Sequence, residues 1–178
     1  MDVLEAIKSR RSVRKYKPIP VEDEKLNRVL EAVRWAPSAG NRQPWEFVVV
    51  KDSGIRKEIA EIAPYGKFIM EAPLTIAVAV DPSKDPTHYV EDGAIAATHI
   101  LLSAHALGLG SCWVGAFGST YENDVKRILG IPTSLRIVAL VALGYPAETG
   151  TSMRKELKEL VHHESYGRKV ERTEKSKS

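Results

Sequence analysis

The feature that most constrains this sequence is the stretch from Tyr89 to Leu107, which is rich in alanine and apolar on most of its circumference as a helix. A helix of this kind is packed on nearly all sides, because exposed apolar surface is unfavourable in water. A chain of 178 residues has difficulty covering such a helix alone. The stretch therefore predicts a central buried helix and a homodimer in which a second copy covers the remaining face.

The composition is that of one globular domain, with 43% apolar and 28% charged residues. The formal net charge of +3 comes from basic residues spread along the chain, which suits an anionic ligand and not nucleic acid. No membrane partner is expected, because the apolar stretch 94–113 is interrupted by histidine, serine and glycine. We expect residues 1–170 to form a single domain and residues 171–178 to be a charged, disordered tail.

The single cysteine, Cys112, excludes a disulfide within the chain and predicts a reducing compartment. Its neighbours Trp113 and Val114 are apolar and no cation lies beside it, so it is expected to be a buried, inert thiol. The first twenty residues hold no apolar signal-peptide region, which predicts a cytoplasmic protein. No metal is expected, because His99 and His105 fall on different faces of one helix and no HExxH pattern occurs.

Hydrophobic periodicity predicts helices and strands in mixed order, which indicates an α+β fold. Helices are expected over residues 1–10, 21–36, 55–62, 89–107 and 122–129, and strands over residues 45–50, 74–80, 111–114 and 136–143. The β-branched apolar run 74–80 is typical of a strand buried on both faces. A charged helix that contains His162 and His163 is expected near the C-terminus.

Three polar clusters interrupt this pattern, and the first follows the N-terminal helix. Arg10, Ser12 and Arg14 alternate along the sequence, so in an extended segment they point to one side. Two guanidiniums and a hydroxyl could then bind one phosphate. The alternative is a solvated basic helix end that complements the helix dipole, and it is the commoner explanation for this cluster taken alone.

The second cluster is the loop 38–43, which contains the chain's one glutamine, Gln43, and also Asn41. Amide side chains offer a donor and an acceptor, which suits the imide edge of a heterocycle, although loops also use Asn and Gly simply to turn. The third cluster is Arg154 and Lys155. Its alternative is the beginning of the charged C-terminal helix.

Together these segments resemble the FMN-dependent nitroreductases over about residues 1–167. The motifs are Arg-Arg-Ser-Val-Arg-Lys-Tyr, Ala-Pro-Ser-Ala-Gly-Asn-Arg-Gln-Pro-Trp, Gly-Leu-Gly-Ser-Cys-Trp-Val-Gly, and Leu-Gly-Tyr-Pro followed by Arg154. The first two are specific as a pair at this spacing. The resemblance implies an α+β nitroreductase-like fold with a central mixed β-sheet surrounded by helices, and a homodimer with two FMN sites at its interface.

The resemblance also assigns site residues by motif. The residues implied to hold the phosphate, ribityl chain and pyrimidine edge of FMN are Arg10, Arg11, Ser12 and Arg14, with Arg154 closing on the phosphate. The implied interface loop, which partly reaches a flavin bound mainly by the partner subunit, consists of Pro37, Ser38, Ala39, Asn41 and Gln43. The residues implied beside the isoalloxazine ring are Val114 and Gly115, with Lys67 where many relatives place Asn or Lys.

The implied activity is an oxidoreductase that uses NADH or NADPH to reduce nitroaromatics, quinones or other small electrophiles in a ping-pong cycle. The flavin carries the redox chemistry, so no catalytic side-chain acid is required. A cation from Arg14 or Lys67 near N1 would favour the reduced flavin. Two alternatives stay open, namely a specialised flavin-fragmenting or dehalogenating member of the family, and a non-enzymatic anion- or nucleic-acid-binding module.

Overall fold

The computed structural model describes residues 1–169. Its helices are α1 (Val3–Ser9), α2 (Asp23–Arg34), α3 (Ser53–Ile62), α4 (Tyr89–Ala106), α5 (Glu122–Leu129) and α6 (Leu157–Leu160), with short 3-10 helices η1 (Ala39–Asn41) and η2 (Lys67–Met70). Its strands are β1 (Trp45–Val50), β2 (Leu74–Val80), β3 (Gly110–Gly115) and β4 (Arg136–Gly144). No helix in this part of the chain is long and apolar enough to span a bilayer.

These elements confirm the predicted helices and strands within a few residues at each end, apart from the C-terminal helix. α6 is only 4 residues long and ends before His162 and His163, so the prediction that these histidines lie in a charged helix is wrong. The reason is that α6 has no buried residue, and local charge alone rarely sustains a helix. The predicted tail 171–178 lies outside the described residues.

The four strands form one sheet in the order β1-β2-β4-β3, and each neighbouring pair is antiparallel. The α+β class is confirmed, but the named strands form an antiparallel sheet and not the expected mixed one. The segment β2-α4-β3 is a crossover between two strands that run parallel to each other, and β4 inserts between them. Parallel pairing within residues 1–169 is confined to an isolated bridge between Ser12 and Ser111.

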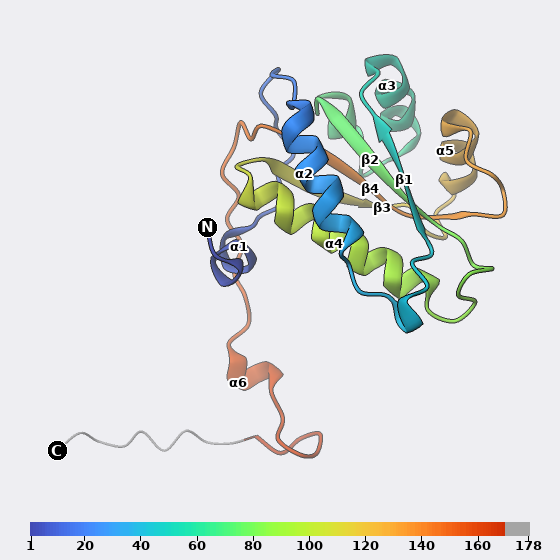
Figure 1. The fold of residues 1–178 in the computed structure, drawn as a ribbon. Helices are drawn as coiled ribbons and strands as arrows, with labels where there is room; N and C mark the ends of the chain where they lie inside the picture. The colour runs from blue at the N-terminus through green and yellow to red at the C-terminus, as the bar shows by residue number, and fades with distance from the viewer. Residues whose placement is uncertain (170–178) are drawn as a thin grey trace.

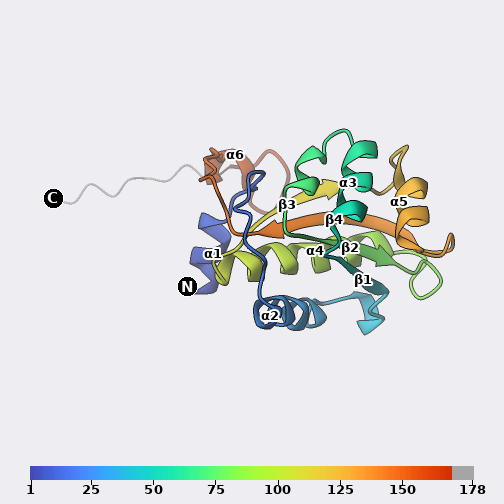
Figure 2. The same ribbon diagram turned by 90° about the horizontal axis from the view of Figure 1, so that it is seen from above.

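The sheet lies between two layers of helices, with α2 and α4 on one face and α3 and α5 on the other (Figure 2). Strand β2 shows how the sequence creates both layers, because all 7 of its residues are buried. Leu74, Ile76 and Val78 pack toward α2 and α4, whereas Ala77 and Ala79 pack toward α3 and α5. The structure thus confirms a strand buried on both faces, with the larger side chains on one side.

Helix α4 lies very close to the sheet. A Cβ atom at Gly93 would come within 2.7 Å of the side chains of both Val80 and Val138, so only glycine allows this approach. The opposite side of α4 carries the exposed Thr98 and the half-buried Leu102. One protomer therefore covers α4 on part of its circumference only, and the covering of the remaining face by a second copy stays a prediction.

A buried carboxylate joins α5 to β4. Glu122 accepts hydrogen bonds from both Nε and Nη2 of Arg136, at 2.8 and 2.9 Å, and from the backbone amides of Ile137 and Gly118. Burial alone would raise the pKa of Glu122, but these donors outweigh it and lower the pKa to about 2. The carboxylate therefore stabilises the folded state most when it is charged.

This network predicts that Glu122→Gln lowers the free energy of unfolding by about 2 to 3 kcal/mol at neutral pH, because it uncouples a buried ion pair. Since the pKa in the fold is depressed, the difference from wild type should shrink as the pH falls from about 4.5 toward about 2. Urea unfolding across this pH range measures the effect. Asp124→Asn, in an exposed pair with Arg127, is the control, and equal stability of both variants at neutral pH would contradict the account.

Candidate functional site

The first polar cluster is held in an extended conformation along the edge of the sheet. After α1, the amide of Val13 donates to the carbonyl of Ser111 at 3.0 Å, and the amide of Ala147 donates to the carbonyl of Lys15 at 2.9 Å. A Cβ atom at Gly110 would lie 2.9 Å from the side chain of Val13, so this glycine lets the segment approach β3. The alternation of charged side chains in an extended segment is the arrangement that the sequence predicted.

A cavity of about 460 Å³ opens beside this segment. It is lined by Arg10, Arg11, Ser12, Arg14, Glu148, Thr149, Gly150, Thr151, Ser152 and Arg154. The first and third polar clusters therefore meet in space, although more than a hundred residues separate them. A Cβ atom at Gly150 would lie 2.9 Å from Cβ of Arg11, so the hydroxyl-bearing segment packs directly on the arginine segment.

Positive charge is concentrated in this cavity. Burial lowers the pKa of Arg10, and the nearby guanidiniums of Arg154 and Arg11 lower it further. Of the described residues that line the cavity, Glu148 is the one carboxylate, and it accepts a 2.8 Å hydrogen bond from the amide of Arg14. Arginine keeps its proton at physiological pH, so an anion bound in this cavity would offset the repulsion between the guanidiniums.

One of these arginines, Arg11, caps the C-terminus of α1, which is the alternative role considered for this cluster from the sequence. Nη1 of Arg11 donates to the carbonyls of Lys8 and Arg10, at 2.7 and 2.8 Å, and so satisfies the C-terminus of α1. The guanidinium of Arg154 instead donates to Oγ of Ser152 at 2.8 Å, inside the cavity lining. Arg11 thus caps α1, whereas the other arginines face the cavity. We call the ten residues that line this cavity the anion cradle.

The amide loop 38–43 lies at the other end of α4. The backbone amide of Ala39 donates to both carboxylate oxygens of Asp92, at 3.1 and 3.3 Å, and the amide of Gln43 donates to Oγ of Ser38 at 3.0 Å. Nε2 of Gln43 donates to Oδ1 of Asn41 at 3.1 Å. The structure therefore gives the two amide side chains a turn-stabilising contact with each other.

The backbone of this loop is strained. Asn41 and Gln43 have φ values of 56° and 48°. These values lie in the left-handed region of backbone conformation, which residues other than glycine rarely adopt. Both residues are exposed, as is Pro37 at the start of the loop. Strained, exposed loops held by a rigid scaffold are characteristic of binding sites.

The cradle and the loop do not meet within one chain. Oγ of Ser9, next to the cradle, lies 2.7 Å from Nε2 of His105 near the C-terminus of α4, whereas Asp92 holds the loop at its N-terminus. These two residues of α4 are roughly 20 Å apart along the helix axis. Figure 1 shows α1 and the loop before β1 at opposite ends of α4.

The remaining predicted residues lie between β3 and η2. Val114 is buried and Gly115 exposed at the end of β3, and a Cβ atom at Gly66 would lie 3.3 Å from Cγ1 of Val114. The guanidinium of Arg14 lies 5.9 Å from the ring centroid of Phe68, which brings η2 beside the cradle. The ammonium of Lys67 is 3.4 Å from the carbonyl of Glu61, so in this chain it bonds to α3.

Cys112 is buried, as predicted. The expectation that no cation lies near it is wrong, because Arg14 and Arg10 come close in space from a distant part of the sequence. Burial raises the pKa of Cys112 and outweighs both guanidiniums, so the thiol stays protonated. Within residues 1–169 no group of His, Cys, Asp and Glu could hold a metal ion.

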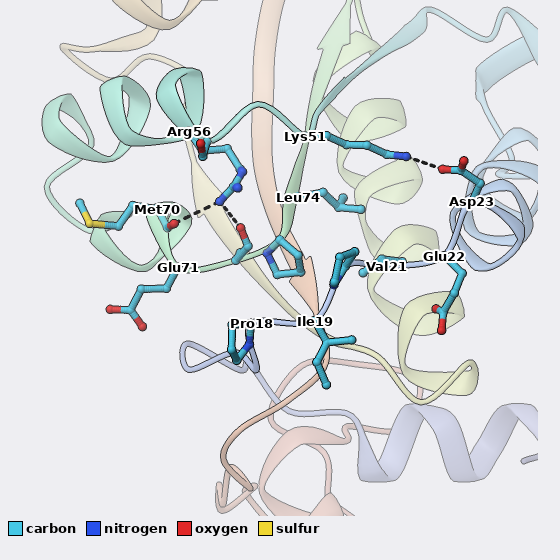
Figure 3. A pocket seen from close by; sticks show the side chains of 14 residues that line it. Pro18, Ile19, Val21, Glu22, Asp23, Lys51, Arg56, Met70, Glu71 and Leu74 are labelled. Carbon is cyan, nitrogen blue, oxygen red and sulfur yellow. Dashed lines mark hydrogen bonds and ion pairs between the residues drawn. The ribbon is translucent and has the colours of Figure 1, made fainter.

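A second cavity, of about 730 Å³, lies between the segment 18–23, α3 and the turn before β2 (Figure 3). Its buried Arg56 donates to the carbonyls of Met70 and Ala72, and Lys51 pairs with Asp23 at its rim. None of the predicted site residues lines it. The guanidinium of Arg56 thus holds the turn before β2, and this cavity is separate from the cradle.

Asp92 is a residue of the candidate site that the sequence did not predict. It is 3% exposed and lies in an otherwise alanine-rich, apolar helix. A carboxylate in such a helix must find hydrogen-bond donors, and it finds the backbone of the loop. That mismatch between residue type and predicted burial was the signal available in the sequence.

Comparison with known proteins identifies the family. The Nitroreductase family profile matches residues 7–64 and 63–145. A Methanothermobacter thermautotrophicus protein named "Putative NADH dehydrogenase/NAD(P)H nitroreductase" is 42% identical over 151 residues, covering 83% of this chain and 79% of the relative.

Solved structures agree with the sequence relatives. An FMN-dependent nitroreductase from Clostridium difficile R20291 superposes with a TM-score of 0.86 at 32% identity, covering 92% of this chain and 99% of that one. A "putative nitroreductase" from Desulfovibrio desulfuricans, solved in complex with FMN, gives 0.81 at 34% identity, covering 93% and 98%. The fold and the family that the motifs predicted are confirmed, and the chain belongs to the nitroreductase family of oxidoreductases.

Proposed function

We propose that this protein binds FMN and uses NADH or NADPH to reduce nitroaromatics, quinones or other small electrophiles in a ping-pong cycle. The anion cradle is the observation that carries the proposal. Burial and the neighbouring guanidiniums of Arg154 and Arg11 lower the pKa of Arg10. The hydroxyls of Ser12, Thr149, Thr151 and Ser152 line the same cavity. This donor set fits a phosphate monoester, because it offers charge-assisted hydrogen bonds from several directions.

The names of the relatives support the same cofactors. The Clostridium difficile relative is FMN-dependent, the Desulfovibrio desulfuricans relative holds FMN, and the archaeal relative is named for NADH and NAD(P)H. Bound FMN would supply the redox chemistry between the nicotinamide and the acceptor. The protein supplies position and charge.

We assign the roles as follows. Arg10, Ser12 and Arg154 hold the phosphate, and Arg11 contributes charge while it caps α1. Arg14 extends from the exposed edge of the cradle toward Phe68, so it is placed to favour negative charge on the reduced ring system. The end of β3, with Val114 and Gly115, forms the surface beside the ring, and Lys67 lies on the neighbouring segment.

We further propose that the site is completed by a second copy of the chain. The loop residues Pro37, Ser38, Ala39, Asn41 and Gln43 lie too far from the cradle in one protomer to share its ligand. The side of α4 that faces away from the sheet, around the half-buried Leu102, would supply an apolar surface for an isologous contact. A two-fold arrangement would bring the loop of each protomer to the cradle of the other.

The phosphate assignment predicts that Arg10→Ala and Arg154→Ala each weaken FMN binding by about 1.5 to 3 kcal/mol, the usual contribution of a hydrogen bond to a charged group. Quenching of flavin fluorescence measures the dissociation constant. Arg28→Ala, which removes an exposed guanidinium from α2, is the matched control and should bind as wild type does. Unchanged FMN affinity in both cradle variants would refute the assignment.

The loop assignment predicts that Asp92→Ala releases residues 38–43 and lowers flavin occupancy, because the amide of Ala39 loses its acceptor. Asp92→Asn keeps one acceptor oxygen and should retain most of the occupancy. Hydrogen exchange at the amide of Ala39 reports the release, and rapid-reaction reduction by NADH reports its effect on the site. Faster exchange without any change in occupancy or reduction rate would leave the loop with a structural role alone.

A further inference from the structure

Helix α1 and the cradle are joined to α4 through one polar contact. α1 is 7 residues long, Ala6 is its buried residue, and Val3, Leu4 and Ile7 are exposed in this chain. At its last residue, Oγ of Ser9 lies 2.7 Å from Nε2 of His105 on α4. Arg10 and Arg11 follow Ser9 directly, so this contact sets where the cradle begins.

The contact also fixes the proton on the imidazole. Oγ of Ser9 lies 2.6 Å from the carbonyl oxygen of Glu5, which can only accept, so the single hydroxyl proton of Ser9 points to that carbonyl. Nε2 of His105 must then carry a proton and donate it to Oγ of Ser9. Nδ1 is the atom that gains or loses a proton, and the bond to Ser9 persists in both charge states.

The surroundings of His105 disfavour the second proton. Burial lowers its pKa, the guanidiniums of Arg10 and Arg11 lower it further, and the carboxylate of Glu5 partly opposes them. These groups come from α1 and from the segment that follows it. A second proton on His105 would therefore add to the positive charge of the cradle, and the lowered pKa keeps free His105 neutral to a lower pH than an ordinary histidine.

We propose that His105 is a positioning residue of the cradle: its Nε2–H holds the end of α1 in place, and its Nδ1 takes up a proton when a phosphate dianion binds beside Arg10. The inference rests on the proposed function and extends it. A bound dianion offsets the charge of Arg10 and Arg11, so the imidazolium form becomes more favourable. By linkage, the same proton uptake strengthens anion binding as the pH falls into the range where free His105 is still neutral.

The direct test is an NMR titration of the histidine Cε1 protons of the wild-type apoprotein between about pH 5 and 8. It is run alone, with inorganic sulfate, which stays a dianion in this range, and with FMN. The chain has 5 histidines, and the spectrum of His105→Gln assigns the signal. We expect both ligands to move the titration midpoint of His105 upward, and a midpoint that neither ligand moves overturns the proposal.

Two substitutions separate the two roles of His105. A glutamine amide can still donate to Ser9 but cannot gain charge, so His105→Gln should bind FMN within about twofold of wild type near pH 8 and roughly three- to tenfold more weakly near pH 5.5. Ser9→Ala removes the bond and keeps the imidazole, so its FMN affinity should fall roughly three- to tenfold at both pH values. Equal affinities of wild type and both variants at both pH values would overturn the proposal.

His99→Gln is the matched control, because His99 lies on the same helix and its Nδ1 is 3.0 Å from the carbonyl of Ile95. It should leave the pH dependence of FMN binding unchanged, and the same pH dependence in both glutamine variants would count against His105. The failure of the proposed function would look different. If wild type binds no FMN but sulfate still moves the midpoint of His105, the cradle serves another anion and the role of His105 stands.

Discussion

The close approach of α4 to the sheet is the constraint on which the rest of this structure depends. Gly93 brings the helix against Val80 and Val138, where any Cβ atom would collide. Because α4 packs so closely on the sheet, the positions of its two ends follow from this contact. One end holds the loop 38–43 through Asp92, and the other holds α1 through His105.

This arrangement separates the two halves of the candidate site by most of the length of α4. The cradle supplies positive charge and hydroxyl donors, whereas the loop supplies amides on a strained backbone. The arginine segment is tied to β3 by a backbone hydrogen bond from Val13 to Ser111, and the loop is tied to α4 by the carboxylate of Asp92. One chain therefore does not bring the two halves together, and we propose that a second copy of the chain does.

Much of the fold could be predicted from local sequence. The bounds of β1 and β2 follow from apolar runs that end at Lys51 and Asp81, and those of α5 from its amphipathic pattern and the glycine after it. The insertion of β4 between β2 and β3 could not be predicted in this way, since strand order depends on contacts between distant segments. The length of α6 also could not be predicted, because none of its residues is buried in the core.

The candidate site, like the fold, was predicted where it depends on local sequence and not where it depends on contacts between distant segments. The extended arginine segment and the amide loop stand out because polar residues interrupt apolar periodicity. The family resemblance implied that Arg154 lies beside Arg10. What the sequence could not reveal were other contacts between distant segments, such as Arg14 near Cys112 and Asp92 under the loop. His105 was considered only as a metal ligand, and its contact with Ser9 requires the packing of α1 on α4.

The shared-site claim is tested most directly by a heterodimer in which one subunit carries Arg10→Ala and the other carries both Asn41→Ala and Gln43→Ala. The two chains are given different affinity tags and purified in tandem, and FMN binding is measured beside both variant homodimers. If each site combines the cradle of one subunit with the loop of the other, both lesions fall in one site, and about half of the wild-type FMN sites keep wild-type affinity. A heterodimer with no site of wild-type affinity, or a loop-variant homodimer that binds FMN as wild type does, would contradict the account.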